Sequence, residues 1–227
     1  MIVPLWNHNS QTESIILLRV TVPTSYAERR KLQLRDEIID AAFDVFAERG
    51  YHEAGVADIA ARVGIGHSTF YRHFDGKRDI LDQVISGLID RLHSALVAEN
   101  APDAATSLAE YRNQVHRIAE VLDEICSDAR VVRMLVIQAA GVDTELEKKV
   151  FGLFDMGADL TAGYLENGRA LGYLRSDLDC AATANAVVGM IVGSAMLTLN
   201  PQPGGVARDR VIQSAVDLMF DGVSAPD

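Results

Sequence analysis

The sequence predicts an all-α protein with a small N-terminal head and a larger helical body. Apolar residues recur at three- and four-residue spacing from residue 26 almost to the C-terminus. No run of alternating β-branched residues bounded by turns interrupts them, and glycines or prolines separate the periodic stretches. With 227 residues, 48% of them apolar, the chain can bury a sizeable core as one large domain or two small ones.

The charge of the chain is unevenly distributed. The formal net charge of −11 excludes a histone-like polyanion binder. Residues 1–78 carry ten basic and ten acidic side chains, whereas the remainder carries 11 basic and 22 acidic ones. Only the head could therefore face a polyanion such as DNA.

The cysteines and the N-terminal residues indicate a reducing compartment. Cys126 and Cys180 lie far apart with no metal-ligand spacing, which predicts neither a disulfide framework nor a zinc site. The apolar run at residues 15–18 lacks the features of a signal peptide. We expect a cytoplasmic protein.

Two short helical stretches in the head are separated by three residues. A first helix is expected over residues 26–49, a second over 56–63, and a third over 67–74 after Gly64-Ile65-Gly66. This arrangement predicts a helix-turn-helix, whose second helix enters the major groove of DNA.

The third predicted helix has one apolar and one polar face. Phe70 and Phe74 are expected in the core with Ile65. The outer face then carries hydrogen-bonding side chains suited to base edges and phosphates: His67, Ser68, Tyr71 and Arg72, with Thr69 and His73 at the margins.

These residues fall at the spacings of a known family. Gly50-Tyr51, Asp58-Ile59-Ala60, Gly64-Ile65, residues 69–74 (TFYRHF) and Lys77 resemble the TetR-type transcriptional repressors, over residues 35–81. The resemblance implies a homodimer with an N-terminal helix-turn-helix and a C-terminal ligand-binding and dimerisation domain. It implies extents of 1–26 for a flexible extension, 27–75 for the DNA-binding domain and 76–227 for the body.

The resemblance also implies roles for individual residues. His67, Ser68 and Thr69 would address bases or phosphates, Tyr71 and His73 would contact the DNA backbone, and Lys77 would bind phosphate. The sequence departs from the family where Ala54 and Gly55 replace a usual threonine or serine, Gly66 a frequent capping serine, and Ser68 a common glycine. We expect one phosphate contact to be lost and Ser68 to add a base contact.

The N-terminal part of the first helix carries a basic run. Arg29, Arg30 and Lys31, with Arg35 one turn on, form either a solvated helix face or a strip along the phosphate backbone. Phosphate contact by Arg30 and Arg35 is favoured slightly, although Glu28, Asp36 and Glu37 dilute the field. Residues 1–25 would be a minor-groove arm or, as we favour, an extension with no role.

The body is expected to contain an effector pocket among its middle helices, predicted over residues 108–125, 128–139 and 144–171. Their inward side chains combine adaptable and aromatic surface with few charges, which suits an apolar or amphipathic effector but equally an ordinary core. The candidates are Met134, Ile137, Gln138, Phe151, Phe154 and Tyr164. The helix expected from Lys77 to about Glu99 would link this pocket to the head.

The segment from Cys180 to Leu199 is long enough to cross a bilayer, but its small residues favour a helix interface. Gly189 and Gly193 would let another helix approach closely, and the final predicted helix, over 207–220, would offer Ile212, Ala215 and Met219 as a partner face. We expect a four-helix dimer interface, with core packing inside one protomer as the alternative. A twofold dimer implies a near-palindromic operator.

An enzyme is the rival class of function. The sequence contains no nucleophile motif, no glycine-rich phosphate loop and no HExxH pair, and His116 with Glu120 is the only plausible metal pair. An exposed helix pair is favoured there, so no catalytic residue, metal or cofactor is predicted. The predicted function is a ligand-responsive repressor. The alternatives are a DNA-binding regulator without a ligand and, less favoured, a metal-assisted enzyme.

Overall fold

The computed structural model describes residues 25–97, 101–200 and 207–224. Within these ranges the chain is helical, with one isolated β-bridge between Leu174 and Ser224 and no strand. The predicted all-α class is confirmed. The expectations for residues 1–24 and for the end of the linking helix at about Glu99 lie outside the described residues.

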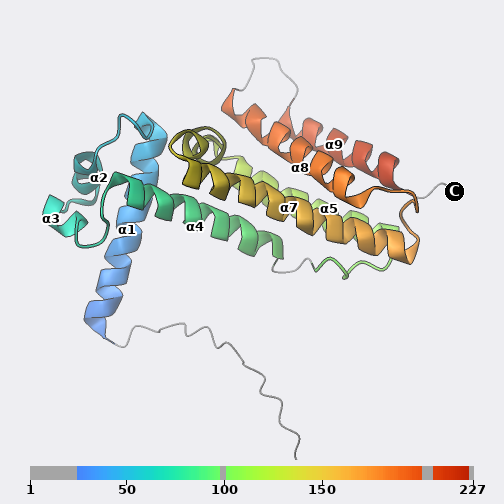
Figure 1. Cartoon of the computed structure of the whole chain (residues 1–227), viewed down its shortest axis with the longest axis horizontal. Helices are drawn as coiled ribbons and strands as arrows, with labels where there is room; N and C mark the ends of the chain where they lie inside the picture. Colours follow the sequence, from blue (N-terminus) through green and yellow to red (C-terminus); the bar gives the residue numbers. More distant parts are fainter. Residues whose placement is uncertain (1–24, 98–100, 201–206, 225–227) are drawn as a thin grey trace, which may run out of the picture.

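The head consists of α1 (Tyr26–Arg49), α2 (Val56–Val63) and α3 (His67–Phe70). A reciprocal capping box fixes the start of α1: the Glu28 amide donates to the Ser25 hydroxyl at 3.1 Å, and the Ser25 amide donates to the Glu28 carboxylate at 3.0 Å. The helix ends at Gly50, whose φ of +80° favours glycine. Figure 1 shows α1 crossing one end of the body, with α2 and α3 on its far side.

The apolar core of the head continues into the body. Ile38, Phe46, Ile59 and Phe70 are fully buried in it. The same cluster includes Ile80, Leu81 and Ile85 of α4 (Lys77–Val97), and then Met134 and Leu146 of the body. The boundary expected between residues 75 and 76 thus falls inside one continuous core, in keeping with a three-helix head too small to bury much surface by itself.

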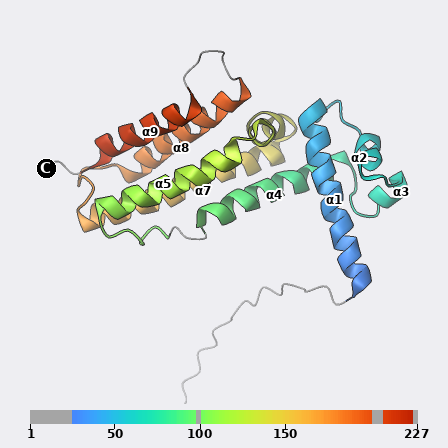
Figure 2. The same cartoon turned by 180° about the vertical axis from the view of Figure 1, so that it is seen from behind.

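The rest of the body is a bundle in which α7 (Thr144–Leu171) is the longest helix. It contains α5 (Leu108–Cys126), α6 (Ala129–Val132), the π-helical η1 (Arg133–Gln138), the 3-10 turn η2 (Ala139–Gly141), α8 (Cys180–Met196), the 3-10 turn η3 (Leu197–Leu199) and α9 (Arg208–Val223). The helix expected over 128–139 is therefore broken into a short α-helix and a π-helical turn. In both cartoon views α8 and α9 lie side by side along one edge of the bundle (Figures 1 and 2).

A second core cluster closes the end of the body away from the head. Its centre is Tyr111 of α5, whose ring centroid lies 5.5 Å from that of Phe220 and 6.0 Å from that of Tyr173. Leu165 of α7 and Ala184 of α8 complete it without exposure to solvent. The two clusters leave a region of looser packing between them in the middle of the bundle.

One segment of the described chain, Cys180–Leu199, is long and apolar enough to span a membrane by length and composition. Only 17% of its most apolar window is buried inside the protomer. The helix therefore leaves an apolar surface on the outside of the bundle.

Two glycines of α7 offer a matched test of this packing. A Cβ on Gly168 would lie 2.5 Å from Leu174 Cδ1, whereas a Cβ on Gly152 would meet nothing within 4 Å. We expect Gly168→Ala to lower the free energy of unfolding by about 1–3 kcal/mol through overpacking. Gly152→Ala should raise it by about 0.5–1 kcal/mol through helix propensity. Urea unfolding of both variants measures this, and equal effects would contradict the close contact at Gly168.

Candidate DNA interface and effector cavity

A glycine turn sets the direction of α3. Gly64 has the left-handed conformation, with φ of 76° and ψ of 32°. The amides of Gly64 and Ile65 donate to the carbonyls of Ala61 and Ala60 at 3.2 and 3.0 Å, which closes α2 and redirects the chain. Gly66 then starts α3 without a side-chain cap, as its departure from the usual serine predicts.

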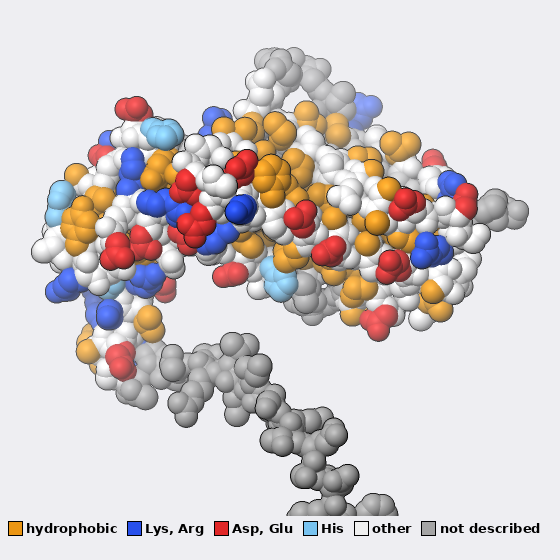
Figure 3. All heavy atoms as spheres, viewed as in Figure 1, with side chains coloured by type: hydrophobic (Ala, Val, Ile, Leu, Met, Phe, Trp, Pro, Cys, Tyr) orange, Lys and Arg blue, Asp and Glu red, His pale blue; other side chains and the backbone are white. Residues whose placement is uncertain are grey.

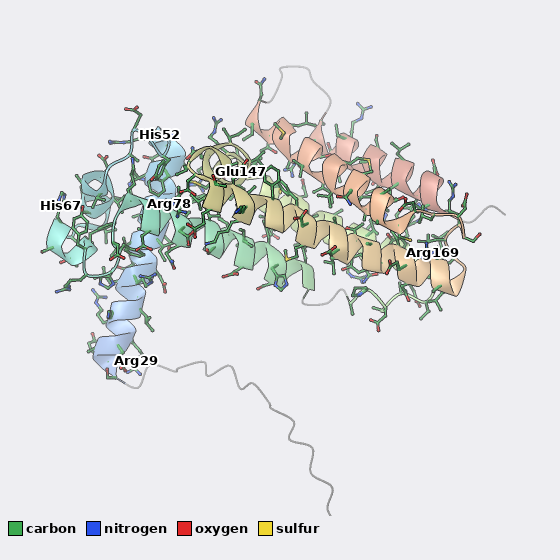
Figure 4. All side chains as sticks on the ribbon, viewed as in Figure 1. Arg29, His52, His67, Arg78, Glu147 and Arg169 are labelled. Carbon is green, nitrogen blue, oxygen red and sulfur yellow. The ribbon has the colours of Figure 1, made fainter. Side chains whose placement is uncertain are left out.

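Two phenylalanines hold α3 against the head. Phe70 and Phe74 are buried with ring centroids 5.6 Å apart, and the Phe70 carbonyl accepts from the amides of His73 and Phe74. The α-helix proper ends at Phe70, so the expected helix over 67–74 finishes as hydrogen-bonded turns. His67, Ser68, Tyr71 and Arg72 are exposed, and Thr69 and His73 are half-buried. In Figure 4 His67 lies at the end of the molecule farthest from the body.

Basic side chains from α1 and from the turn after α3 act electrostatically on His73. Burial lowers the pKa of His73, and the charges of Lys31, Arg72 and Arg35 lower it further, which places all three near its ring. At neutral pH this imidazole is therefore uncharged. A phosphate group placed here would offset the repulsion of these three cations for one another.

Two of the predicted phosphate ligands are engaged inside the head. The Arg35 guanidinium donates to the His73 carbonyl at 2.7 Å and to Gln83 Oε1 at 3.0 Å, and it lies over the Phe74 ring at 4.4 Å. The Lys77 ammonium donates to the carbonyls of Tyr51 and His52 at 2.8 and 3.1 Å, and it lies over the Tyr51 ring. Both cations thus have acceptors within the chain, and their contact with phosphate stays a prediction.

Carboxylates engage further basic side chains of the head. Arg49 pairs with Asp58 at 2.6 Å, and Arg62 donates to both oxygens of Glu48. Among the residues that the structure describes, Arg29, Arg30, Lys31 and Arg72 have no ion pair, although Arg30 has a long contact of 3.5 Å to Gln33. Figure 3 shows Lys and Arg gathered on the head beside these elements, while acidic side chains spread along the body.

Arg78, at the start of α4, fastens the head to the body (Figure 4). Its guanidinium pairs with Asp143, the N-cap of α7, and with Glu145 at 3.1 Å and Asp82 at 3.4 Å. The hydrogen bond from Arg78 holds the pKa of Asp143 below its usual range, so the tie persists at neutral pH and loosens only as pH falls through that lowered value. One helical turn further along α4, Asp82 also pairs with Lys149 of α7 at 2.6 Å.

A largely apolar cavity lies between the two core clusters in two adjoining lobes. The first lobe, of about 120 Å³, lies between α5, α7, α8 and α9 and includes Tyr111 and Met219 in its wall. The second, of about 130 Å³, includes Leu92 and Leu96 from the end of α4 and Leu153 of α7. Both lobes share the following lining residues: Ile118, Leu122, Cys126, Thr161, Tyr164, Ile191 and Ala195.

The cavity contains two of the six predicted ligand-binding residues, Phe154 and Tyr164. Ile137 and Phe151 are 51% and 54% exposed and do not line it, Met134 is buried in the first core cluster, and the Gln138 amide donates to the Phe46 carbonyl of α1 at 3.2 Å. For Met134, Ile137 and Gln138 the physical reason is the π-helical turn of η1, whose wider spiral rotates the face that a 3.6-residue period predicts; Phe151 lies on α7, outside this turn. Leu135 and Val136 line the cavity instead. The sequence offered no signal for this rotation.

The predicted dimer residues divide into two groups. Gly189 and Gly193 are on an exposed face, where a Cβ would meet nothing within 4 Å. Ile212, Ala215 and Met219 line the first lobe of the cavity within the same chain, and their contact with a partner stays a prediction. The apolar stripe of α9 is used to close its own bundle.

No group of three or more metal-ligating side chains occurs within the described ranges 25–97, 101–200 and 207–224. His116 is half-buried and Glu120 exposed on α5. This pair therefore has no third ligand in that part of the chain.

The fold and the exposed face of α3 define a helix-turn-helix DNA-binding protein with a helical C-terminal body. Residues 38–84 match the family model described as bacterial regulatory proteins, tetR family. The chain is 27% identical over 217 residues to the HTH-type transcriptional repressor KstR2 of Rhodococcus jostii (strain RHA1), covering 91% of this chain and 99% of that protein. Residues 38–84 are therefore a DNA-binding domain of the TetR type, and the chain as a whole is similar to TetR-type regulators of transcription.

Solved structures share the fold. A putative transcriptional regulator from Saccharomonospora viridis in complex with choline superposes with a TM-score of 0.73 at 21% identity, covering 86% of this chain and all of that one. The regulator FadR from Bacillus subtilis in complex with stearoyl-CoA gives a TM-score of 0.62 at 21% identity, covering 82% and 98%. The relatives are regulators of transcription and not enzymes, in agreement with the predicted class of function.

Arg72 and Arg62 form a matched pair for testing the DNA face. Arg72 is exposed without an ion pair among the described residues, whereas Arg62 is paired with Glu48 on the side of α2. We expect Arg72→Gln to weaken operator binding and to reduce the slope of log affinity against log salt by about one. Arg62→Gln should leave that slope unchanged. Fluorescence anisotropy at several salt concentrations measures it, and an unaltered slope for Arg72→Gln would exclude a phosphate contact there.

Proposed function

We propose that this chain is a homodimeric repressor that binds a near-palindromic operator and is released from it by a small apolar or amphipathic effector. Tyr71, Arg72 and His73 contact the DNA backbone, and His67, Ser68 and Thr69 address base edges or phosphates. Arg30, with Arg29 and Lys31, follows the phosphates from α1. The protein acts where bacterial DNA lies, in the cytoplasm.

The observation that carries an effector is the cavity whose wall includes the end of α4. Leu92 and Leu96 line its second lobe, while Lys77 and Arg78 begin the same helix at the head. An occupant that displaces the end of α4 therefore moves the element to which the head is packed. Because the head shares a continuous core with α4, it follows as a unit.

The ion pairs at the start of α4 determine which end of the helix can move when an effector binds. Arg78 and Asp82 fix the first two turns of α4 to α7 through Asp143 and Lys149. The free end of α4 can then tilt about this fixed point. A tilt changes the spacing of two recognition helices that must enter grooves about 34 Å apart.

The dimer interface is assigned to α8 with the outer face of α9. Small exposed residues follow one stripe of α8, namely Ala182, Ala186, Gly189 and Gly193, and Leu218 on neighbouring α9 is 66% exposed. A second copy of this surface supplies the apolar neighbour that the protomer lacks. The twofold axis of such a dimer places two heads on one operator.

Ligand response also has support from a structural neighbour, since FadR of Bacillus subtilis was solved in complex with stearoyl-CoA. That molecule has a long apolar tail and a polar head. The cavity of this chain is likewise lined mostly by aliphatic and aromatic side chains. A regulator without a ligand is the second candidate, and a cavity that binds no apolar compound would favour it.

Assembly is tested by filling the small-residue stripe. Gly189→Leu and Gly193→Leu introduce side chains into open space in the protomer, so folding should be preserved. Overpacking of about 1–3 kcal/mol at the interface would weaken dimerisation about 5- to 150-fold. Sedimentation measures the dissociation constant, with Gly87→Leu on the exposed face of α4 as control. An unaltered dimer in both stripe variants would contradict this interface.

Regulation is tested with a preformed operator complex titrated with dodecanol, dodecanoic acid and a steroid. An effector should release DNA with a coupling of about 1–3 kcal/mol, and operator must weaken effector binding by the same factor. Lys149→Met, which breaks the pair with Asp82, should reduce this coupling more than it changes either affinity. Release only by metal ions or strongly polar metabolites would contradict an apolar effector, and equal effector binding with and without operator would contradict the α4 mechanism.

A further inference from the structure

The first lobe of the cavity has a charged group at one end. Arg208, the first residue of α9, lines it together with Asp123 and Cys126 of α5 and Ser194 of α8. Most of the remaining wall is aliphatic or aromatic. An arginine beside a space of this kind needs a physical explanation, because guanidinium groups are costly to remove from water.

The guanidinium is only partly satisfied by its neighbour. Nη2 of Arg208 pairs with Asp123 at 3.1 Å, and the Asp123 side chain is 48% exposed. Nε of Arg208 is fully buried and has no acceptor among the described residues. The Ser194 hydroxyl donates to the Met190 carbonyl, so its hydrogen bond is made elsewhere. A charged donor without an acceptor costs folding free energy that an arriving acceptor would recover.

The ion pair also acts on the cavity wall. Cys126 lines both lobes, and burial raises the pKa of its thiol while Arg208 lowers it and Asp123 raises it. The two charges therefore lie close enough to act on the inner surface of the cavity. Tyr164, also shared by both lobes, has a pKa raised to about 12 by burial and stays neutral. Among the described residues that line the two lobes, Arg208 is the only Lys, Arg or His.

We propose that Arg208 is the anchor for the carboxylate of an apolar monocarboxylic acid, whose tail extends past Tyr164 toward Leu92 and Leu96. A carboxylate matches the guanidinium fork, whose Nε has no acceptor among the described residues. This inference rests on the proposed function, since it assigns the chemical class of the effector in the same cavity.

The size of the two lobes sets the length of the tail. A dry apolar cavity of about 150 Å³ accepts one benzene molecule. Lobes of about 120 and 130 Å³ therefore each hold a piece near that size, and together they hold a chain of about twelve carbon atoms. Dodecanoate has a chain of this length and is therefore the probe.

The experiment compares dodecanoate with two neutral molecules of the same tail, dodecanol and methyl dodecanoate, and with dodecanoyl-CoA. Their affinities for the full-length protein are measured by displacement of a fluorescent apolar dye. The variants are Arg208→Met, which keeps much of the apolar stem, and Arg210→Met, which removes an exposed arginine two residues away on the same helix. Circular dichroism confirms that each variant is folded.

We expect wild-type protein to bind dodecanoate at least tenfold more tightly than either neutral molecule. Arg208→Met should abolish this preference while leaving the affinity for dodecanol within about twofold, and Arg210→Met should preserve the preference. Asp123→Asn, which removes the competing carboxylate, should tighten dodecanoate binding and not dodecanol binding.

The outcomes separate this inference from the proposed function. Equal binding of acid and alcohol to the wild type, or a preference that survives Arg208→Met, overturns the anchor and leaves an apolar effector in place. Binding of dodecanoyl-CoA without binding of dodecanoate also overturns the anchor, because the polar group recognised would then be the thioester with the phosphates of CoA. If none of the four compounds binds, both the anchor and the apolar effector fail. If Arg208→Met does not fold, the Asp123→Asn variant still tests the anchor. An unchanged ratio of the affinities for dodecanoate and dodecanol in that variant overturns the anchor.

Discussion

The structure depends on the fixed start of α4. Arg78 brings together carboxylates from two helices, Asp82 of its own and Asp143 at the N-cap of α7, and its rigid fork of donors sets the angle between them. Such half-exposed ion pairs contribute modestly to stability. Their effect is geometric: they fix the start of α4 where the head begins, while Leu92 and Leu96 near its other end line the cavity.

The position of the cavity follows from the way the bundle is packed. The first core cluster joins the head to the near end of the body, and the second closes the far end around Tyr111 and Phe220. Dense interiors move as units, so displacement is absorbed where packing is loose. The loose region lies between the clusters and reaches the end of α4. A ligand site there is therefore mechanically connected to the DNA face without touching it.

The basic side chains of the head fall into two groups, those with partners inside the chain and those without an ion pair among the described residues. Arg35, Arg49, Arg62, Lys77 and Arg78 stabilise the head and its junction through carbonyls and carboxylates. Arg29, Arg30, Lys31 and Arg72 have no ion pair among the described residues; Lys31 and Arg72 act on His73, whereas Arg29 lies at the far end of α1 (Figure 4). A head with as many acidic as basic side chains can thus present unpaired cations, because Asp58 and Glu48 are already paired with Arg49 and Arg62. The acidic body repels DNA and so favours an approach through the head.

Local patterns in the sequence were sufficient for the helix-turn-helix. The glycines at 64 and 66, the buried Phe70 and Phe74 and the polar face between them are separated by a few residues, and helical periodicity relates such positions reliably. The bounds of α1 and α7 were predicted for the same reason, since caps and glycine stops are local signals.

The use of each long side chain was decided only by tertiary structure. The contacts of the Lys77 ammonium with the carbonyls of Tyr51 and His52 join residues 26 and 25 positions apart, which no local pattern relates. The place of Ile212, Ala215 and Met219 in the cavity wall depends on how α9 lies against α5 and α7. Because η1 is π-helical, Leu135 and Val136 line the cavity at the positions where the helical period predicted Met134 and Ile137. An apolar stripe specifies that a face is buried, but the identity of the surface that buries it is a property of the assembled bundle.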